Sequence, residues 1–424
     1  MSLRLPAFLL ATLVVLPLSA ATRMTYDING TPTPIEWDRP AFPLKYEIES
    51  RVAQANPNAA AMVDKAFAAW AAIPDADVSF RSGGVVNNAM PQATNRISIS
   101  LADDLFENQG AAAVTSYSYD TKTGRMLDAD ITIDKALFDG NVNAQVALQH
   151  EIGHVLGLDH SAVLASIMYP YVSAGTDPAT FELDDRISIA TMYPKGDPTL
   201  TGATLSGRVI GDQGGIFAAQ VVALDADGQP AGTVLTNAAG EFTLSGMPAG
   251  RYKLYAEPLD GPVQPQALQG TWRQAAATPF PTEFFASTVQ VENGRVYGNL
   301  VLNTSGPVQL NPKWIGVSEA DTQDMSLSTS SASVRPGQTV KIMVAGDGFT
   351  SGMTNFEVTS PAFRRISDFG WSHNCVHATY VVEGNAPAMS ASVVVRSGRD
   401  TAMLTGALRV NRVSTGGRTR SVRK

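Results

Sequence analysis

Three of the chain's five histidines lie within eleven residues, at a spacing that suits a metal ion. They are His150, His154 and His160, in the segment QHEIGHVLGLDHSAVLASIMYP at residues 149–170. Residues four apart share one face of a helix, so His150 and His154 can reach the same ion. Gly157 tolerates backbone conformations that other residues resist, which lets the chain turn and bring His160 back as a third ligand. Three neutral imidazoles leave one tetrahedral position open, the pattern of a catalytic zinc.

Glu151 follows the first of these histidines and is wrongly placed to replace a ligand. It is close enough to take a proton from a water molecule at the metal. Zinc lowers the pKa of bound water towards about 7 and polarises a carbonyl group, so these residues suit hydrolysis of a peptide bond. The alternative is a buried amphipathic helix that carries histidines by chance. The third histidine and the glycine make the whole pattern far more specific than HExxH alone.

The pattern HExxHxxGxxH, followed by a methionine within a turn, resembles the metzincin zinc endopeptidases. Ser161 and the turn at residues 166–170, Ser-Ile-Met-Tyr-Pro, resemble the matrixin branch. The resemblance covers roughly residues 35–195 and implies an α+β zincin-type catalytic domain. It also implies that Met168 forms an apolar floor beneath the metal.

Tyr169, Pro170 and Tyr171 follow the methionine and are expected to wall the substrate pocket beside the zinc. Matrixins commonly have Pro-x-Tyr there, whereas this chain has Pro-Tyr with nothing between. Family members often carry a structural zinc with three further histidines, and animal matrixins are usually held latent by a propeptide cysteine. The histidines before position 373 are the three in the motif, and the one cysteine is Cys375, so we expect neither device.

The composition is typical of folded, soluble domains. The chain has 424 residues, which suggests about three domains, with 44% hydrophobic and 17% charged residues. The net charge of −8 argues against nucleic acid as the main partner. A single cysteine excludes an intrachain disulfide, so we expect stability to come from hydrophobic cores and bound metal.

Residues 1–21 are typical of a secretory signal: Arg4, an apolar run at 5–18 and small residues at 19–21, with cleavage after Ala20 or Ala21. A membrane anchor is the alternative, but the run is short and two prolines interrupt it. Later stretches are too short or too polar to span a membrane. We therefore expect the mature chain to be secreted or periplasmic.

The catalytic domain is expected at residues 22–197, beginning with a short polar lead at 22–36. The segment 110–119 resembles the edge strand that pairs with extended substrate in matrixins, since an edge strand offers free N–H and C=O groups to a peptide. Residues 37–49 lead into a strand in which Tyr46 and Ile48 alternate. Periodicity also predicts a helix at 59–72, strands at 96–101 and 128–134, the active-site helix from Asn141 or Asn143, and a closing helix at 182–194.

Residues 101–140 are strongly acidic, which leaves two readings open. Clustered carboxylates suit calcium, whereas a solvated acidic face needs no ion. The segment holds three basic residues against eight acidic ones: Asp103, Asp104, Glu107, Asp120, Asp128, Asp130, Asp134 and Asp139.

Two all-β domains are expected after the catalytic domain. Short alternating strands at 203–304 predict a β-sandwich, and Thr236 to Pro258 resembles carboxypeptidase-regulatory or transthyretin-like domains. Nothing in this domain indicates catalysis. Residues 306–411 alternate similarly, and we interpret them as an immunoglobulin-like sandwich. Residues 412–424 form a basic tail that is expected to be disordered.

A second cluster lies in the last of these domains, where His373, Cys375 and His377 alternate. On a strand their side chains share one face and could bind a metal. With no fourth ligand in view, ordinary polar residues of a strand are the alternative.

The sequence thus favours a secreted zinc endopeptidase that acts on extracellular proteins and peptides. The alternative is a secreted adhesion or matrix-binding protein with a dormant protease domain, in which the two sandwiches carry the function. A complete set of ligands and base argues against dormancy. A third arrangement keeps both roles, with the sandwiches docking the protease to a polymer or cell surface.

Overall fold

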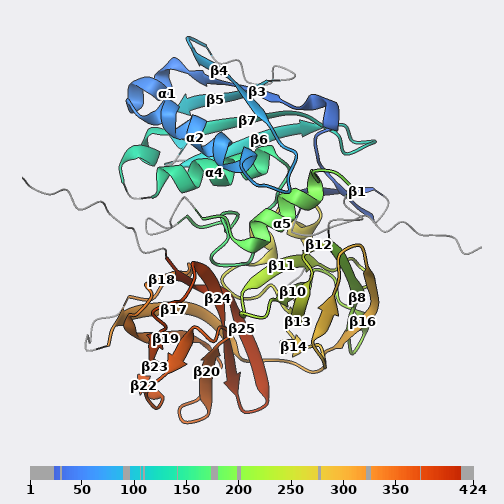
Figure 1. Ribbon diagram of the computed structural model, residues 1–424, viewed down its shortest axis with the longest axis vertical. Coiled ribbons are helices and arrows are strands. Elements are labelled where there is room, and N and C mark those ends of the chain that lie inside the picture. The colour runs from blue at the N-terminus through green and yellow to red at the C-terminus, as the bar shows by residue number, and fades with distance from the viewer. Residues whose placement is uncertain are drawn as a thin grey trace, which may run out of the picture.

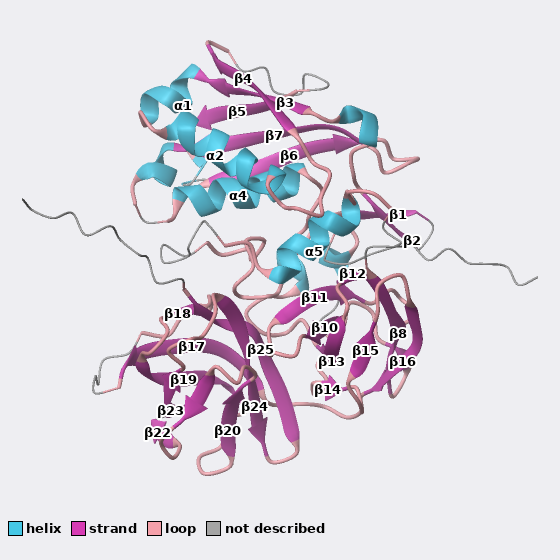
Figure 2. Cartoon of the chain, viewed as in Figure 1, coloured by secondary structure: helices cyan, strands magenta, loops and turns pink. Residues whose placement is uncertain are grey.

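The computed structural model describes residues 23–28, 31–88, 96–105, 107, 110–140, 142–172, 180–197, 202–275, 278–320, 326–372 and 374–411. The expected signal segment at 1–21, the expected tail at 412–424, Asn141 and His373 lie outside the described residues. Within them, an N-terminal unit of sheet and helices stands on two β-sandwiches (Figures 1 and 2). The chain is therefore multidomain and rich in strands. No helix in the described ranges is both long and apolar enough to cross a membrane.

The N-terminal unit is built on one mixed sheet, with strand order β4-β3-β5-β7-β6. Neighbouring strands from β4 to β7 are parallel, whereas β6 runs antiparallel to β7 and forms one edge. The strands are β3 Leu44–Glu49, β4 Phe80–Val86, β5 Ile97–Ala102, β6 Ala113–Tyr119 and β7 Met126–Asp134.

Helices α2 (Ala59–Ala71) and α4 (Ala144–Val155) pack side by side against this sheet. Val63, Phe67 and Trp70 recur at helical spacing on α2, so they share the face that is buried with Ile131 of the sheet. The Trp70 indole Nε1 donates to the Gln149 carbonyl at 2.8 Å, which ties α2 to α4. The short helix α1 is Ser50–Ala55, and 3-10 turns lie at η1 Arg39–Ala41 and η2 Lys135–Phe138.

The segment at 22–36 is not the short polar lead that the sequence indicated. Strands β1 (Thr25–Ile28) and β2 (Thr31–Pro34) form a hairpin, and the neighbouring Met24 and Ile35 are buried in the core. The Met24 N–H donates to the Gly157 carbonyl at 3.0 Å, so this segment packs behind the end of α4.

Both ends of α4 follow from local chemistry. The Asn143 side chain caps the first turn by accepting from the Gln145 and Val146 N–H groups. At the other end Gly157 has φ +96°, and a Cβ there would overlap the Ile35 carbonyl oxygen. Glycine is therefore required where the chain turns from the helix towards His160.

Helix α5 (Leu183–Met192) lies between the N-terminal unit and the sandwiches (Figure 1). Glu182 and Asp185 form a capping box at its start. The Asp185 carboxylate also accepts from the Ser166 hydroxyl and the Ile167 N–H, and Asp184 accepts from the Thr233 hydroxyl of the first sandwich. One helix end therefore fixes both the loop after the third histidine and the domain beneath it.

The first sandwich pairs a sheet of order β11-β10-β13-β14, with β15 also on β13, and a sheet of order β12-β8-β16, with β9 on β8. Its strands are β8 Ala203–Gly211, β9 Gly214–Gly215, β10 Gln220–Leu224, β11 Pro230–Leu235, β12 Glu241–Met247, β13 Gly250–Glu257, β14 Glu283–Phe284, β15 Val289–Val291 and β16 Val296–Asn303. Between β13 and β14 the chain makes two 3-10 turns, η3 Pro265–Ala267 and η4 Trp272–Gln274.

The second sandwich pairs a sheet of order β17-β19-β23-β21, with β22 also on β23, and a sheet of order β18-β25-β24-β20. Its strands are β17 Asn311–Glu319, β18 Ala332–Val334, β19 Thr339–Asp347, β20 Thr354–Val358, β21 Phe363–Arg365, β22 Gly370–Ser372, β23 Cys375–Val382, β24 Met389–Ser397 and β25 Asp400–Val410.

The loop at residues 160–171 is held by the second sandwich. The Leu164 N–H donates to the Thr405 carbonyl at 2.9 Å, and the buried Arg409 guanidinium donates to the Ala165 carbonyl. Arg409 also pairs with Glu182 at 3.2 Å, and both side chains are almost fully buried. Separating such a pair leaves a buried charge without a partner. This contact therefore fixes the position of the second sandwich relative to the N-terminal unit.

The turn at Gly157 predicts a specific sensitivity to an added methyl group. Gly157→Ala is expected to lower the free energy of unfolding by about 3 kcal/mol, because it adds backbone strain and an overlap with Ile35. Gly140 also has a positive φ, but nothing lies near the position of its missing Cβ, so Gly140→Ala should cost only about 1 kcal/mol. Denaturant unfolding measures both values, and equal losses would show that the Ile35 contact is unimportant.

A buried carboxyl between the sandwiches predicts a pH dependence. Glu257 accepts from the Gln220 amide at 2.6 Å and the Thr405 hydroxyl at 2.7 Å, and burial raises its pKa to about 7. At pH values above the ordinary pKa of 4.5, folding therefore takes up a proton at Glu257. The stability that this group provides falls as the pH rises to about 7.

Glu257→Gln should remove that decline, because glutamine stays neutral. We expect its melting temperature to match the parent's at pH 5 and to exceed it by several degrees at pH 8. Glu292→Gln, at an exposed carboxylate, is the matched control and should follow the parent at both pH values. A parent and Glu257→Gln that change identically with pH would contradict the assignment.

Candidate metal centre

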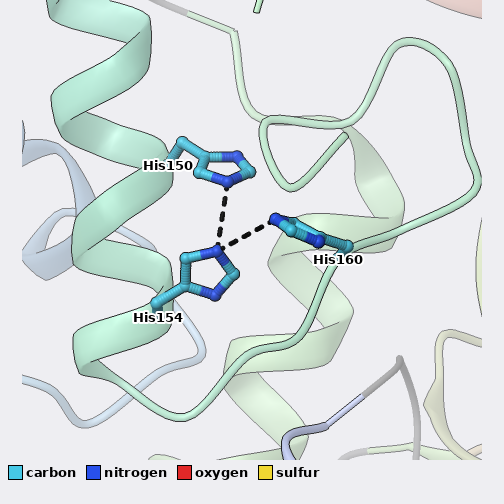
Figure 3. Close-up of side chains that lie close together, drawn as sticks. All are labelled: His150, His154 and His160. Carbon is cyan, nitrogen blue, oxygen red and sulfur yellow. Dashed lines mark hydrogen bonds between the residues drawn. The ribbon is translucent and has the colours of Figure 1, made fainter. Parts of the chain in front are cut away.

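The three histidines of the motif come together at one point (Figure 3). His150 and His154 project from one face of α4, and His160 reaches them from the loop beyond Gly157. The Nε2 atoms of His150 and His154 are 3.1 Å apart, and those of His154 and His160 are 3.2 Å apart. Among the residues that the structure describes, this is the group of three or more His, Cys, Asp or Glu side chains whose ligand atoms converge.

The outer nitrogen of each ring determines what the inner nitrogen can do. The Nδ1 atoms of His150 and His154 lie 2.8 Å from the carbonyl oxygens of Ile167 and Leu158, and His160 Nδ1 contacts the Ala267 carbonyl. A carbonyl oxygen only accepts, so each Nδ1 carries the proton. Each Nε2 then presents a lone pair, and three lone pairs face one another without a donor.

Burial keeps these rings neutral, because it lowers the pKa of His150 and of His160 to about 4 and that of His154 as well. Neutral imidazoles with anchored Nδ1–H groups are the form that binds a transition metal. The donor set therefore fits a cation such as zinc, which prefers nitrogen ligands in tetrahedral geometry.

Glu151 lies beside this group and is itself buried. Its carboxylate Oε2 accepts from the Thr115 hydroxyl of β6 at 2.6 Å, and the same hydroxyl lies 3.0 Å from the Glu151 carbonyl. Burial raises the pKa of Glu151 to about 7, and the hydrogen bond from Thr115 opposes that rise. A carboxyl group with this pKa can both take and return a proton near neutral pH. Sequence reasoning did not identify Thr115.

Met168 packs against the helix that carries two of the histidines. It is buried, and a Cβ at Gly153 would overlap its sulfur atom. The Met168 carbonyl accepts from the Ser161 N–H at 2.8 Å, which closes the loop after His160. Met168 thus lies in the core beneath this part of α4, where a glycine makes room for it.

The three residues after Met168 differ in their surroundings. Tyr169 is buried with Leu164 and side chains of the second sandwich, and its hydroxyl donates to the Thr329 carbonyl. Pro170 is half-buried, whereas the Tyr171 side chain is 51% exposed. Of the three side chains that the sequence placed around a substrate pocket, Tyr171 is thus the most accessible.

The first sandwich, in whose sequence nothing indicates catalysis, contacts the site through its backbone. Its Ala267 carbonyl contacts His160 Nδ1, and its Gln269 N–H donates to the Asp159 carboxylate at 2.9 Å. A backbone group can come from any residue type, so no sequence signal identifies Ala267. Asp159, which is adjacent to a ligand in the motif, was the one sequence feature that could have indicated a contact here.

The other metal predictions remain untested. Several acidic residues in 101–140 have structural partners: Asp120 and Asp134 accept from backbone N–H groups in turns, and Asp103 pairs with Arg51. Cys375 and His377 share one face of β23, but His373 lies outside the described residues. Calcium in the acidic segment and a metal in the second sandwich stay predictions.

Comparison with known families gives matches to two parts of the chain. Residues 36–194 match the family model described as matrixin, and residues 204–274 match that of the carboxypeptidase regulatory-like domain. These confirm the two resemblances that the sequence indicated. Among solved structures, the major pilin subunit of Bacillus cereus aligns with 48% of this chain and 66% of its own at 8% identity, with a TM-score of 0.17.

Curated relatives match a limited share of the chain. Stromelysin-1 of Rattus norvegicus is 35% identical over 23% of this chain and 21% of its own length. Matrilysin of Homo sapiens is 33% identical over 22% and 36%, and Metalloendoproteinase 4-MMP of Arabidopsis thaliana is 30% identical over 20% and 26%. The match thus spans about a fifth to a third of the relatives, and the N-terminal unit around the three histidines is similar to a matrixin domain.

Proposed function

We propose that this protein is a secreted zinc-dependent endopeptidase that hydrolyses peptide bonds at the His150, His154 and His160 centre. One observation carries the proposal: three neutral imidazoles, two of them buried and that of His160 partly buried, point their lone pairs at one another beside a buried glutamate. Without a cation these lone pairs would be unsatisfied in a buried site. The similarity of residues 36–194 to matrixins, whose members depend on zinc, supports the same reading.

The role proposed for each residue follows from where its side chain lies relative to the three ring nitrogens. His150, His154 and His160 would hold a zinc ion, which when bound would act as a Lewis acid towards the scissile carbonyl and lower the pKa of water. Glu151 takes the proton of the attacking water and passes it to the leaving amine. Thr115 orients the Glu151 carboxylate through its hydrogen bond, and Met168 packs beneath the ligands.

The edge strand β6 supports a peptide as substrate. It borders the sheet, pairs on one side with β7, and carries Thr115 next to Glu151. An extended peptide can add to such an edge through main-chain hydrogen bonds and so bring a backbone carbonyl to the centre. We include Tyr171, with Tyr169 and Pro170 behind it, in the proposed substrate pocket.

The remaining parts of the proposal concern the sandwiches. We propose domains at 22–197, 203–304 and 306–411, the last an immunoglobulin-like sandwich, with two facing sheets as support. Docking to a polymer or cell surface has no specific observation behind it. The contacts of Ala267, Thr405 and Arg409 favour a role in supporting the active-site loop.

Glu151→Gln tests the base. It should retain bound zinc and the parental melting temperature but lose at least about 100-fold in kcat, because glutamine cannot accept the proton. Hydrolysis of a quenched peptide and metal analysis measure both properties. Glu292→Gln, at an exposed position, is the control and should keep parental turnover. Parental turnover of Glu151→Gln would refute the assigned role.

Metal content tests the centre itself. The purified chain should bind one zinc ion, and a chelator should abolish turnover until zinc is restored. His160→Ala should lose most of the metal, because two imidazoles bind zinc far more weakly than three. His377→Ala, in the second sandwich, should keep one zinc per chain. Loss of metal in His377→Ala, or none in His160→Ala, would place the ion elsewhere.

A further inference from the structure

Two segments far apart in the sequence cover one end of the edge strand β6. The Tyr117 hydroxyl of β6 donates to the Gln269 side-chain oxygen of the first sandwich at 2.9 Å. Two residues further along, the Tyr119 ring lies 4.9 Å from that of Tyr26 in the N-terminal hairpin, measured between ring centroids. We call residues 24–26 and 265–271 together the end wall.

The end wall is firmly held. Leu268 and Trp272 anchor the second segment in the buried cluster that joins the sandwiches. The Gln269 N–H donates to both Asp159 carboxylate oxygens, at 2.9 and 3.1 Å. The two segments also touch each other, because the Thr271 N–H donates to the Thr25 carbonyl at 3.3 Å and a Cβ on Gly270 would overlap the same carbonyl oxygen.

The distance from the proposed catalytic glutamate to the end wall is short. Thr115, Tyr117 and Tyr119 alternate along β6 and therefore lie on one face of it. Thr115 contacts Glu151, whereas Tyr117, the next residue on that face, contacts the end wall. A peptide extended along β6 advances ~3.4 Å per residue, so about two peptide residues fit between these points.

We propose that the end wall limits substrates to about two residues on one side of the scissile bond. The substrate class is then peptides cut about two residues from one chain end. The proposed hydrolytic centre is kept, but release of a dipeptide or a similarly short product takes the place of the unrestricted internal cleavage of an endopeptidase. This inference rests on the proposed function, because it presumes that Glu151 and the three histidines cleave peptides. It assigns the first sandwich a part in substrate selection.

Gln269 is the side chain to change. Gln269→Ala removes the contact with Tyr117 but keeps the backbone N–H to Asp159 and leaves Ala267 in place. Gln266 lies three residues before Gln269, in the 3-10 turn η3, and is exposed, so Gln266→Ala is the matched control. Unchanged zinc content and melting temperature would show that both variants keep the fold and the centre.

The test uses a series of peptides that share one central sequence and are lengthened residue by residue at either end. Using the full mature chain with zinc, we expect kcat/KM to fall at least tenfold once one side exceeds about two residues, with no such fall on the other side. Gln269→Ala should recover at least threefold on the longer peptides, and Gln266→Ala should not. Frequent internal cleavage of casein, or a flat length profile, would overturn the end wall while leaving the peptidase intact.

Binding gives an independent reading that needs no turnover. In Glu151→Gln, fluorescence anisotropy of labelled peptides should show affinity dropping at the same length, and the added Gln269→Ala change should lessen the drop. If the zinc-loaded parent cleaves no peptide, the proposed function is wrong. The binding measurements are then the test of the end wall. Equal binding of short and long peptides, or none at all, would then overturn it.

Discussion

The convergence of three unprotonated ring nitrogens is the constraint on which this structure depends. Lone pairs at this spacing repel one another until a cation joins them, so the protein must hold the rings from behind. It does so with three backbone carbonyls from different parts of the chain: Ile167 beside Met168, Leu158 just beyond α4, and Ala267 in the first sandwich. The geometry of the centre is therefore a property of the whole assembly.

Buried ionisable side chains connect the metal centre to the two sandwiches that support it. Helix α5 begins with Glu182, Asp184 and Asp185, all buried where the three units meet. Asp185 fixes the turn before Met168, while Glu182 pairs with Arg409 of the second sandwich. Burial raises the pKa of each of these carboxyl groups, so the junction favours their neutral forms more than water does. Hydrogen bonds to Ser161, Ser166 and Thr233 offset part of that effect.

The sequence predicted what depends on local pattern. Helical spacing placed α2 and α4, alternation placed β5 and β7, and the resemblance to matrixins placed β6. The motif identified three side chains whose ring nitrogens do converge. Asn143 was one of two expected caps, and its side chain does cap α4. These features are encoded within a few residues, so a single chain is enough to predict them.

What the sequence did not predict depends on contacts between distant segments. Ala267 contacts His160 through its carbonyl, and Gln269 contacts Asp159 through its N–H, so neither of these two contacts depends on residue type. Thr115 meets Glu151 only because the fold brings β6 over α4. The N-terminal hairpin looked polar because its buried apolar residues, Met24 and Ile35, flank its strands.

The shared burial of Arg409 and Glu182 restricts how this architecture can change in evolution. A catalytic domain joined by a linker can exchange its partners freely, since neither surface is fitted to the other. Here a replacement sandwich would have to supply a cation at the same depth, a carbonyl for Leu164 and room for Val163, which closely approaches Gly406. The N-terminal unit and the sandwiches are thus expected to be inherited together, and recombination between relatives should preserve the set as one block.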